Sequence, residues 1–482
     1  MANLKQKTIK SFLWAFGERF GVQAMQLIAF VILARILSPD AFGLMGLIAI
    51  FITISQELVD SGFGLALIQS KSVDDIDYSS IFFINLIVSG SIFVVLFFIA
   101  PFIATFFAEP ILVNLTRVLG LKFIISSFSI VQIARLTREV EFKKLMLAKV
   151  PSTIIGGAVG IAMAYYGFGV WSLIGQQLSD ALAYSIQIWI QSSWKPMLVL
   201  NWGKVKKLFS YGSKLMVSGL LFASYRNMYE LFLGKYYSTT QVGYYSQSDR
   251  VKQIPVLNIS QVIARVSFPI LSRFQDDDEK LKQSYKVLIR NVLLVIAPVM
   301  IGSIVIAEYL FRYVLTEKWV PAVPFFQILC IDGLLYPLHV YNLNVLKVKG
   351  RSDLYLKMET IRFTLSLIGL LSVAWYSVYA IVWMKILVGL ITVVIFNRYC
   401  NKFIGYGLWE QFLDIKTILL GALIMGFCVN IFINVISLSD LEVLISSTIL
   451  GAVIYLICIY TFERKLLIEV KNIINRKKEN DF

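Results

Sequence analysis

Long apolar runs, separated by short polar connections, follow one another along almost the whole chain. A membrane-spanning helix needs about 20 mostly apolar residues, and about fourteen runs approach or exceed that length. They cover residues 11–36, 42–68, 80–107, 111–134, 151–167, 169–192, 211–234, 253–271, 291–311, 321–346, 358–375, 377–397, 417–436 and 442–462. This pattern predicts an all-α integral membrane protein with about 14 transmembrane helices.

One short phrase occurs twice in the chain. Residues 33–45 (LARILSPDAFGLM) return as residues 233–245 (LGKYYSTTQVGYY). Each copy holds an apolar run, a cation, a turn led by Ser and a Gly that opens the next apolar run. Many transporters consist of repeated hydrophobic halves with a central site between two lobes. The repeat therefore favours transport as the function.

Composition agrees with a membrane protein. The chain is 58% hydrophobic and only 16% charged, with a mean hydropathy of +0.74, whereas soluble domains are about half apolar and about a quarter charged. The run 11–36 is too long for the core of a signal peptide, so we expect it to be a retained first helix. The four cysteines stand singly, which indicates neither a disulfide framework nor a metal site.

Basic residues concentrate on alternate connections between the runs, and the net charge is +15. The positive-inside rule then predicts a multi-pass protein with both termini in the cytoplasm and a basic cytoplasmic tail over 464–482. Because these charges lie on separate short loops, anionic membrane lipids are expected partners and nucleic acid is not. Residues 136–150 mix charged and apolar positions and predict a helix along the cytoplasmic interface.

Three segments carry a resemblance to a known family: 33–45, 60–69 (DSGFGLALIQ) and 346–357 (LKVKGRSDLYLK). Together with the predicted spans, they resemble the polysaccharide transport family, the Wzx-type oligosaccharide flippases and exporters of the MOP superfamily. Within that family the chain resembles the colanic-acid and teichuronic-acid exporter branch. The resemblance extends from the N-terminus to about residue 405.

The resemblance implies two pseudo-symmetric six-helix lobes around a central cavity, followed by two C-terminal helices. The expected divisions are an N-lobe over 1–197, a cytoplasmic inter-lobe linker over 198–208, a C-lobe over 209–400 and two last helices over 401–463. The implied substrate is an undecaprenyl-pyrophosphate-linked oligosaccharide, the repeat unit of an exopolysaccharide or lipopolysaccharide. Alternating access of the two lobes would move it across the bacterial cytoplasmic (inner) membrane, with polysaccharide polymerase and assembly proteins as further partners.

Cations inside the spans are the first candidate site residues, because intramembrane charges are costly and usually face a cavity or a partner. We expect four of them to bind the pyrophosphate or acidic sugars of a substrate: Arg19, Arg226, Arg265 and Lys385. The forked guanidinium of Arg suits phosphate. For Arg226 the alternative is an ion pair with Glu230, four residues on. Arg117 and Lys122 are expected to extend toward the lipid headgroups instead.

Acids inside the spans are the second set of candidates, for ion coupling or charge pairing: Glu18, Glu57, Asp60, Asp180, Glu230 and Asp332. Glu57 and Asp60 share one helix face, where two carboxylates could bind Na⁺ or share a proton. The alternative is that they neutralise Arg19 or another cation. Beyond such Na⁺ or H⁺ coupling we expect no cofactor, and the absence of a P-loop phrase argues against ATP hydrolysis.

Two other functions compete with a lipid-linked oligosaccharide flippase. One is another MOP-superfamily transporter, either a peptidoglycan-precursor flippase or a multidrug and toxin extruder. The deep arginines favour an anionic substrate over a cationic drug. The other is a polytopic polysaccharide polymerase or ligase, which usually needs a large external loop or a catalytic domain. The longest external connection, about 235–252, is short, so no enzymatic activity is expected.

Overall fold

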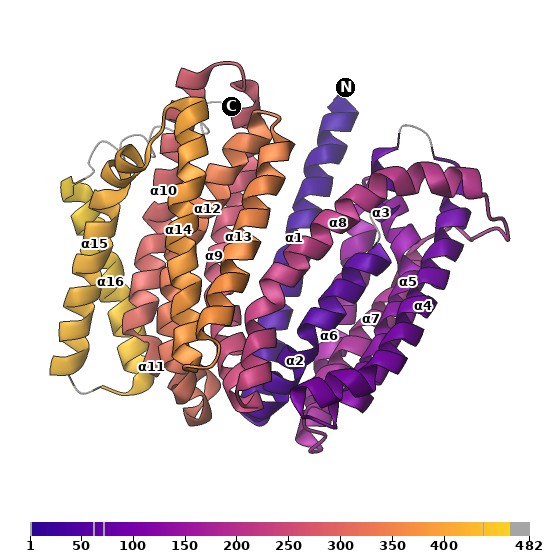
Figure 1. Cartoon of the computed structure of the whole chain (residues 1–482), viewed down its shortest axis with the longest axis horizontal. Coiled ribbons are helices and arrows are strands. Elements are labelled where there is room, and N and C mark those ends of the chain that lie inside the picture. The colour runs from indigo at the N-terminus through magenta and orange to yellow at the C-terminus, as the bar shows by residue number, and fades with distance from the viewer. Residues whose placement is uncertain (1, 61–62, 71–72, 437, 463–482) are drawn as a thin grey trace. The chain divides into compact units, whose positions relative to one another are not determined.

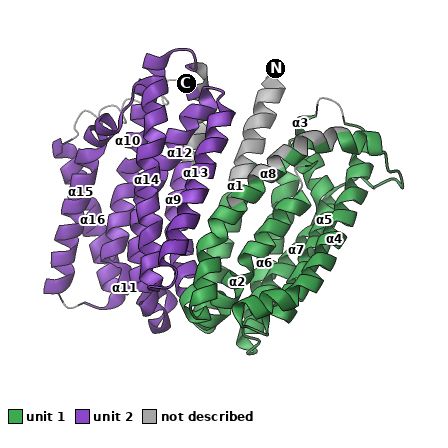
Figure 2. Ribbon diagram, viewed as in Figure 1, with its two compact units in different colours: residues 1–243 green, residues 244–482 purple. Residues whose placement is uncertain are grey.

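The computed structural model describes residues 2–60, 63–70, 73–436 and 438–462, and these residues are helical apart from short connections. They fall into two compact units, which we call unit 1 (residues 1–243) and unit 2 (residues 244–482) (Figure 2). The boundary lies inside helix α9, Thr239–Arg273. It falls after the predicted linker 198–208 because α8, Trp202–Tyr236, packs against helices of unit 1.

Unit 1 is a bundle of long helices in which α6 packs against α1 and α7, α5 packs against α4 and α7, and α2 packs against α8 (Figure 1). Besides α8 and the start of α9, the helices are α1 (Ala2–Ile36), α2 (Pro39–Asp60), α3 (Phe63–Gln69), α4 (Asp75–Phe107), α5 (Leu112–Arg138), α6 (Phe142–Tyr165) and α7 (Trp171–Gln191).

Unit 2 is a second helical bundle, in which α12 packs against α10 and α14, and α15 packs against α10 and α16. A π-helical turn (Phe311–Leu315) and a 3-10 segment (Glu317–Ala322) precede α12. The helices after α9 are α10 (Asp278–Val305), α11 (Ala307–Leu310), α12 (Val323–Val348), α13 (Ser352–Val373), α14 (Val378–Ile404), α15 (Leu408–Val435) and α16 (Asp440–Phe462). The predicted tail 464–482 lies outside the described residues.

Among the described residues, 10 helical segments are long and apolar enough to cross a membrane. Each overlaps one of the predicted runs, which confirms an all-helical membrane protein. The other four predicted spans fall in α7, α8, α9 and α13 and stay predictions. One predicted run, 42–68, is divided in the structure, since α2 ends at Asp60 and α3 begins at Phe63.

The predicted interfacial helix over 136–150 is wrong. Helix α5 ends at Arg138 and α6 begins at Phe142. Between them Val140 adopts a φ of 61°, in the left-handed region that a right-handed helix cannot continue through. The charged and apolar positions of 136–150 therefore belong to the ends of two different helices.

The predicted external connection over 235–252 is also wrong, because α9 begins at Thr239. The two copies of the repeated phrase form equivalent turns, one between α1 and α2 and one between α8 and α9. These turns pack on each other: a Cβ on Gly43 would collide with the carbonyl of Thr239, and a Cβ on Gly243 with that of Pro39. Asp40 accepts a hydrogen bond of 3.1 Å from the Thr239 hydroxyl. Glycine in both copies thus permits the close approach of α2 and α9.

Candidate functional site

Four side chains on α5, α6 and α7 form a polar group that we call the unit 1 charge cluster: Lys122, Lys149, Gln177 and Asp180. The Lys149 ammonium lies 2.8 Å from a carboxylate oxygen of Asp180. Thr153, one turn further along α6, donates to the other carboxylate oxygen over 3.3 Å. The charge of Asp180 is therefore neutralised by a cation on the neighbouring helix.

Two glycines of α6 bring α6 and α7 together at this cluster. A Cβ on Gly156 would lie 2.7 Å from Cβ of Asp180, and a Cβ on Gly160 would lie 2.8 Å from Cβ of Gln176. Small residues four apart are a common means of close approach between membrane helices. The sequence GGAVG over 156–160 thus sets the distance across which Lys149 and Asp180 meet.

Lys122 has a different kind of partner. It projects from α5, about 15 Å along that helix from its start at 1.5 Å per residue, and donates to the side-chain oxygen of Gln177 over 3.1 Å. Within the part of the chain that the structure describes, no carboxylate lies within ion-pair distance of Lys122. The expectation that Lys122 extends toward the headgroups is wrong, because its ammonium turns toward α7. Arg117, on the same helix, instead lies 4.0 Å above the ring of Phe97.

The other candidates on α1 and α2 lie near the cluster or at a helix end. Glu18 and Arg19 are half-buried on α1, and Glu18 is close enough to Lys149 for their charges to interact. Asp60 is exposed at the end of α2. It accepts a hydrogen bond of 3.2 Å from Gln56, one turn earlier.

Helix α8 carries the next candidates. The carboxylate of Glu57, on α2, lies against the backbone of Gly219 on α8, where a Cβ would collide with it. Arg226 is exposed and Glu230 is half-buried on the same helix. The side chain of Arg265, on α9, lies outside the described residues.

A second group, the unit 2 charge cluster, consists of Asp249 and Lys252 on α9, Asp332 on α12 and Lys385 on α14. Lys252 lies 2.8 Å from Asp249 and 2.9 Å from Asp332. Lys385 lies 3.2 Å from Asp249 and 3.8 Å from Asp332, and donates to the Tyr245 hydroxyl over 3.1 Å. Two ammonium groups and two carboxylates therefore compensate one another.

The unit 2 charge cluster is largely removed from solvent. The Lys252 side chain is 6% exposed, and that of Asp332, the most exposed of the four, is 20% exposed. Asp332 and Lys385 are predicted site residues, whereas Asp249 and Lys252 are assigned by the sequence to an external connection. The repeated phrase contains the information that could have placed Asp249 and Lys252 on a helix. Because Gly43 lies in the first turns of α2, Gly243 should likewise lie near the start of a helix, which places positions 249 and 252 on one helix face.

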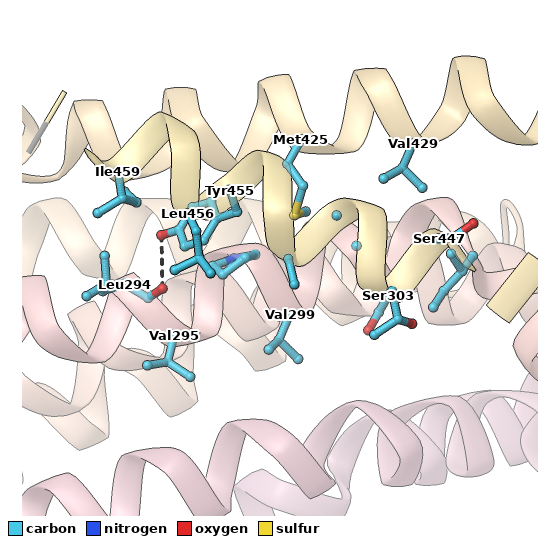
Figure 3. A pocket seen from close by; sticks show the side chains of 16 residues that line it. Leu294, Val295, Val299, Ser303, Met425, Val429, Ser447, Tyr455, Leu456 and Ile459 are labelled. Atoms are coloured by element: carbon cyan, nitrogen blue, oxygen red, sulfur yellow. Dashed lines mark hydrogen bonds between the residues drawn. The ribbon is translucent and has the colours of Figure 1, made fainter. Parts of the chain in front are cut away.

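Unit 2 also contains an apolar groove between α10, α15 and α16, with a volume of about 550 Å³ (Figure 3). The Tyr455 hydroxyl donates to the carbonyl of Leu294 over 2.9 Å at one end, and Ser303 and Ser447 lie at the other (Figure 3). Aliphatic side chains make up most of the lining. Such a lining suits a hydrocarbon chain better than a sugar.

Solved structures identify the class of fold. The chain is similar to the lipid II flippase MurJ in its inward closed conformation, with a TM-score of 0.78 at 15% identity, over 95% of this chain and 100% of the other. It is also similar to an inward-facing multidrug resistance transporter of the MATE family in the MOP superfamily, with a TM-score of 0.62 at 16% identity, over 79% of this chain and 95% of the other. The fold is therefore that of MOP-superfamily transporters.

The sequence defines the family more narrowly. Residues 32–324 match the model of the polysaccharide biosynthesis protein family, and the chain belongs to that family. Its candidate membrane spans make it an integral membrane protein.

Three curated relatives illustrate the family. The teichuronic acid biosynthesis protein TuaB of Bacillus subtilis (strain 168) is 26% identical over 79% of this chain and 81% of its own length. The lipopolysaccharide biosynthesis protein WzxC of Escherichia coli (strain K12) is 23% identical over 75% and 74%. The succinoglycan biosynthesis transport protein ExoT of Rhizobium meliloti (strain 1021) is 25% identical over 94% and 93%.

Proposed function

We propose that this protein is a flippase that moves an undecaprenyl-pyrophosphate-linked oligosaccharide, the repeat unit of a surface polysaccharide, from the inner to the outer leaflet of the inner membrane. Membership of the polysaccharide biosynthesis family and the MOP fold support this proposal. So do relatives named for teichuronic acid, lipopolysaccharide and succinoglycan. The single observation that carries it is the environment of Lys122.

A lipid-linked sugar has a tail that the bilayer accepts and a pyrophosphate head that it rejects. A carrier must therefore offer the head positive charge inside the membrane. A charge at that depth is costly, and most intramembrane cations are neutralised by a partner. The hydrogen-bond partner of Lys122 is a neutral amide, Gln177, which does not neutralise an ammonium charge. A compact ammonium group on a flexible stem is well suited to a phosphate oxygen.

The four cations predicted from the sequence remain proposed contacts for the pyrophosphate or acidic sugars, and each would act in a different way. Lys385 is paired with two carboxylates, so it would have to exchange them for a phosphate. Arg19, Arg226 and Arg265 are proposed to guide the head or acidic sugars through electrostatic attraction. Gln177 and the Lys149–Asp180 pair would supply polar contacts next to Lys122.

The transport cycle that we propose is alternating access of units 1 and 2. Glu57 and Asp60 are the proposed coupling acids for Na⁺ or H⁺, with Glu18, Asp180, Glu230 and Asp332 as charge-pair acids. The apolar groove of unit 2 is proposed to hold part of the isoprenoid tail. The competing functions, a peptidoglycan-precursor flippase, a drug extruder or a polymerase, predict different accumulated compounds in a strain that lacks the protein.

The test is export in a host strain deleted for its own copy. Lys122→Gln should abolish surface polysaccharide and cause the lipid-linked oligosaccharide to accumulate, while the amount of protein in the membrane stays near normal. Lys122→Arg should restore part of the export because the charge is kept.

Arg117→Gln is the matched control, since it removes a cation from the same helix that lies over an aromatic ring instead of facing α7. It should export normally. Normal export by Lys122→Gln would remove Lys122 from the proposed site. Accumulation of a peptidoglycan precursor, or drug sensitivity without any loss of polysaccharide, would replace the proposed substrate.

A further inference from the structure

The connection between α7 and α8 exposes a group of neighbouring apolar side chains. Leu198 is 94% exposed and Trp202 is 66% exposed. Met197, Val199 and Leu200 between and beside them are exposed as well. A contiguous exposed apolar patch marks a surface that another phase or molecule covers.

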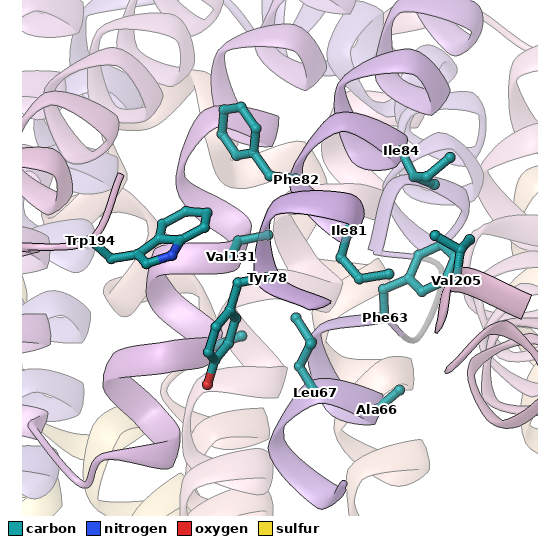
Figure 4. Close-up of a cluster of buried hydrophobic side chains, with 11 residues drawn as sticks. Phe63, Ala66, Leu67, Tyr78, Ile81, Phe82, Ile84, Val131, Trp194 and Val205 are labelled. Atoms are coloured by element: carbon teal, nitrogen blue, oxygen red, sulfur yellow. The ribbon is translucent and has the colours of Figure 1, made fainter. Parts of the chain in front are cut away.

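This connection is held in place on its N-terminal side by an apolar cluster of unit 1. Trp194 is buried there against Tyr78 and Phe82, with ring centroids 5.9 and 6.2 Å apart (Figure 4). Phe63 and Leu67 of α3 belong to the same cluster (Figure 4). Trp194 thus anchors the segment only four residues before Leu198.

Two serines of α4 fix the backbone of the connection itself. The N–H of Met197 donates to the hydroxyl of Ser79 over 3.0 Å, and the N–H of Asn201 donates to that of Ser80 over 3.0 Å. Asn201 also caps α8 through the N–H of Lys204. The apolar tip between these hydrogen bonds is therefore held outward by specific contacts.

The depth of the tip follows from the helix that holds it. Helix α4 is a candidate membrane span that begins at Asp75, and Ser79 lies about 6 Å along it at 1.5 Å per residue. The tip is consequently level with the first turns of a spanning helix. At that level, near the boundary between headgroups and hydrocarbon, Trp side chains are enriched.

The charges around the tip match an anionic lipid surface. Lys195 precedes the apolar residues and Lys206 follows them, and both are exposed. Lys204 is paired with Asp74 and Asp77. Anionic headgroups attract lysines next to a membrane helix.

We propose that residues 197–202 form an interfacial anchor, whose apolar tip inserts into the membrane leaflet while Lys195 and Lys206 bind anionic headgroups. The anchor fixes the depth of the start of α8. Its partner is the lipid surface itself, and this proposal does not depend on the transported substrate.

The test uses the full-length protein with its four cysteines replaced by alanine, a single environment-sensitive fluorophore, and reconstitution into vesicles of phosphatidylethanolamine and phosphatidylglycerol. A fluorophore on Leu198→Cys should emit at a shorter wavelength than the free fluorophore does in water. It should be quenched by nitroxide-labelled lipid rather than by aqueous iodide. The matched control is Asp276→Cys, in the exposed polar connection between α9 and α10, which should show the opposite quenching.

Replacing phosphatidylglycerol by phosphatidylcholine should weaken the lipid quenching at position 198, as should Lys195→Gln with Lys206→Gln. Equal quenching at 198 and 276 would overturn the anchor. Equal insertion in both vesicle types would overturn the role of the anionic headgroups. Shielding that appears only after a membrane extract is added would identify a protein as the occupant and also overturn the proposal. Amide hydrogen exchange of residues 197–202 is compared between the unsubstituted protein and the cysteine-replaced protein in the two lipid mixtures. Equal exchange shows that the cysteine replacements have not altered the segment.

Discussion

The two charge clusters use the same kinds of side chains to opposite effect. In unit 2, Lys252 and Lys385 face two carboxylates, so the cluster is neutral and nearly closed to solvent. In unit 1, Lys149 forms an ion pair with Asp180, whereas the hydrogen-bond acceptor of Lys122 among the described residues is the amide of Gln177. One of the two lysines of the unit 1 charge cluster therefore has an uncharged hydrogen-bond partner. We infer that the partner of an intramembrane lysine, more than its depth, separates a structural charge from a binding charge.

The unit 2 charge cluster should tolerate disruption least. Lys252→Gln leaves Asp249 and Asp332 with one shared cation, and breaking one side of a buried ion pair costs about 3–5 kcal/mol. We expect a large fall in thermal unfolding temperature and in the amount of protein in the membrane. The triple variant Lys252→Gln, Asp249→Asn and Lys385→Gln removes both lysines of the cluster and so leaves Asp332 without a cation there. The double variant Lys252→Gln with Asp249→Asn removes one charge of each sign and is therefore more informative.

That double variant restores one cation for one carboxylate and should recover much of the lost stability. Thermal unfolding of the purified variants measures both changes. If Lys252→Gln unfolds at the wild-type temperature, the contrast between the two clusters fails on the unit 2 side.

Overpacking the α6–α7 contact should give the next largest effect. Gly156→Val places side-chain atoms where Cβ of Asp180 already lies 2.7 Å away, and such overpacking typically costs about 1–3 kcal/mol. We expect reduced stability together with reduced export, since the Lys149–Asp180 pair is displaced. Gly90→Val on α4, where a Cβ meets nothing within 4 Å, is the control and should leave both measurements unchanged.

Filling the apolar groove of unit 2 should reduce transport without unfolding the protein. Val299→Phe narrows the groove beside Ser303 and Met425. If the isoprenoid tail occupies this groove, export should fall several-fold while the unfolding temperature stays the same. Ile186→Phe, in a groove of about 540 Å³ between α5 and α7 of unit 1, is the control. An equal loss of export in both variants would argue against a particular tail site.

The smallest effect concerns the aqueous edge of unit 1. A hydrogen bond from the Lys204 ammonium and one from the N–H of Asp77 lower the pKa of Asp74 to about 2, from an ordinary value of 3.8. Because the folded state favours the ionised carboxylate, this stabilisation is complete above pH 3.8 and is lost as the pH falls through about 2. Asp74→Asn should therefore lower the unfolding temperature slightly at pH 6 and not at pH 2. A constant difference at both pH values would contradict the ion pair.

The sequence predicts the membrane class, ten spans and the family well, because long apolar runs and repeated phrases are local signals. It fails where polar residues are stabilised by distant partners. The polar stretch after Gly243 resembles a loop, yet it is helical, and Asp249 and Lys252 find their partners at Asp332 and Lys385 far along the chain. Lys122 is missed for a related reason. No local pattern reveals that its ammonium meets Gln177, which lies on another helix.

The central claim is that Lys122 binds the phosphorylated head of a lipid carrier. Its most direct measurement is the affinity of the purified protein for undecaprenyl pyrophosphate in detergent, determined for the wild type, Lys122→Gln and Arg117→Gln. We expect Lys122→Gln to bind at least roughly tenfold more weakly, as the loss of one charge-assisted contact to phosphate implies, with Arg117→Gln close to the wild type. Equal affinities for all three proteins would contradict the claim.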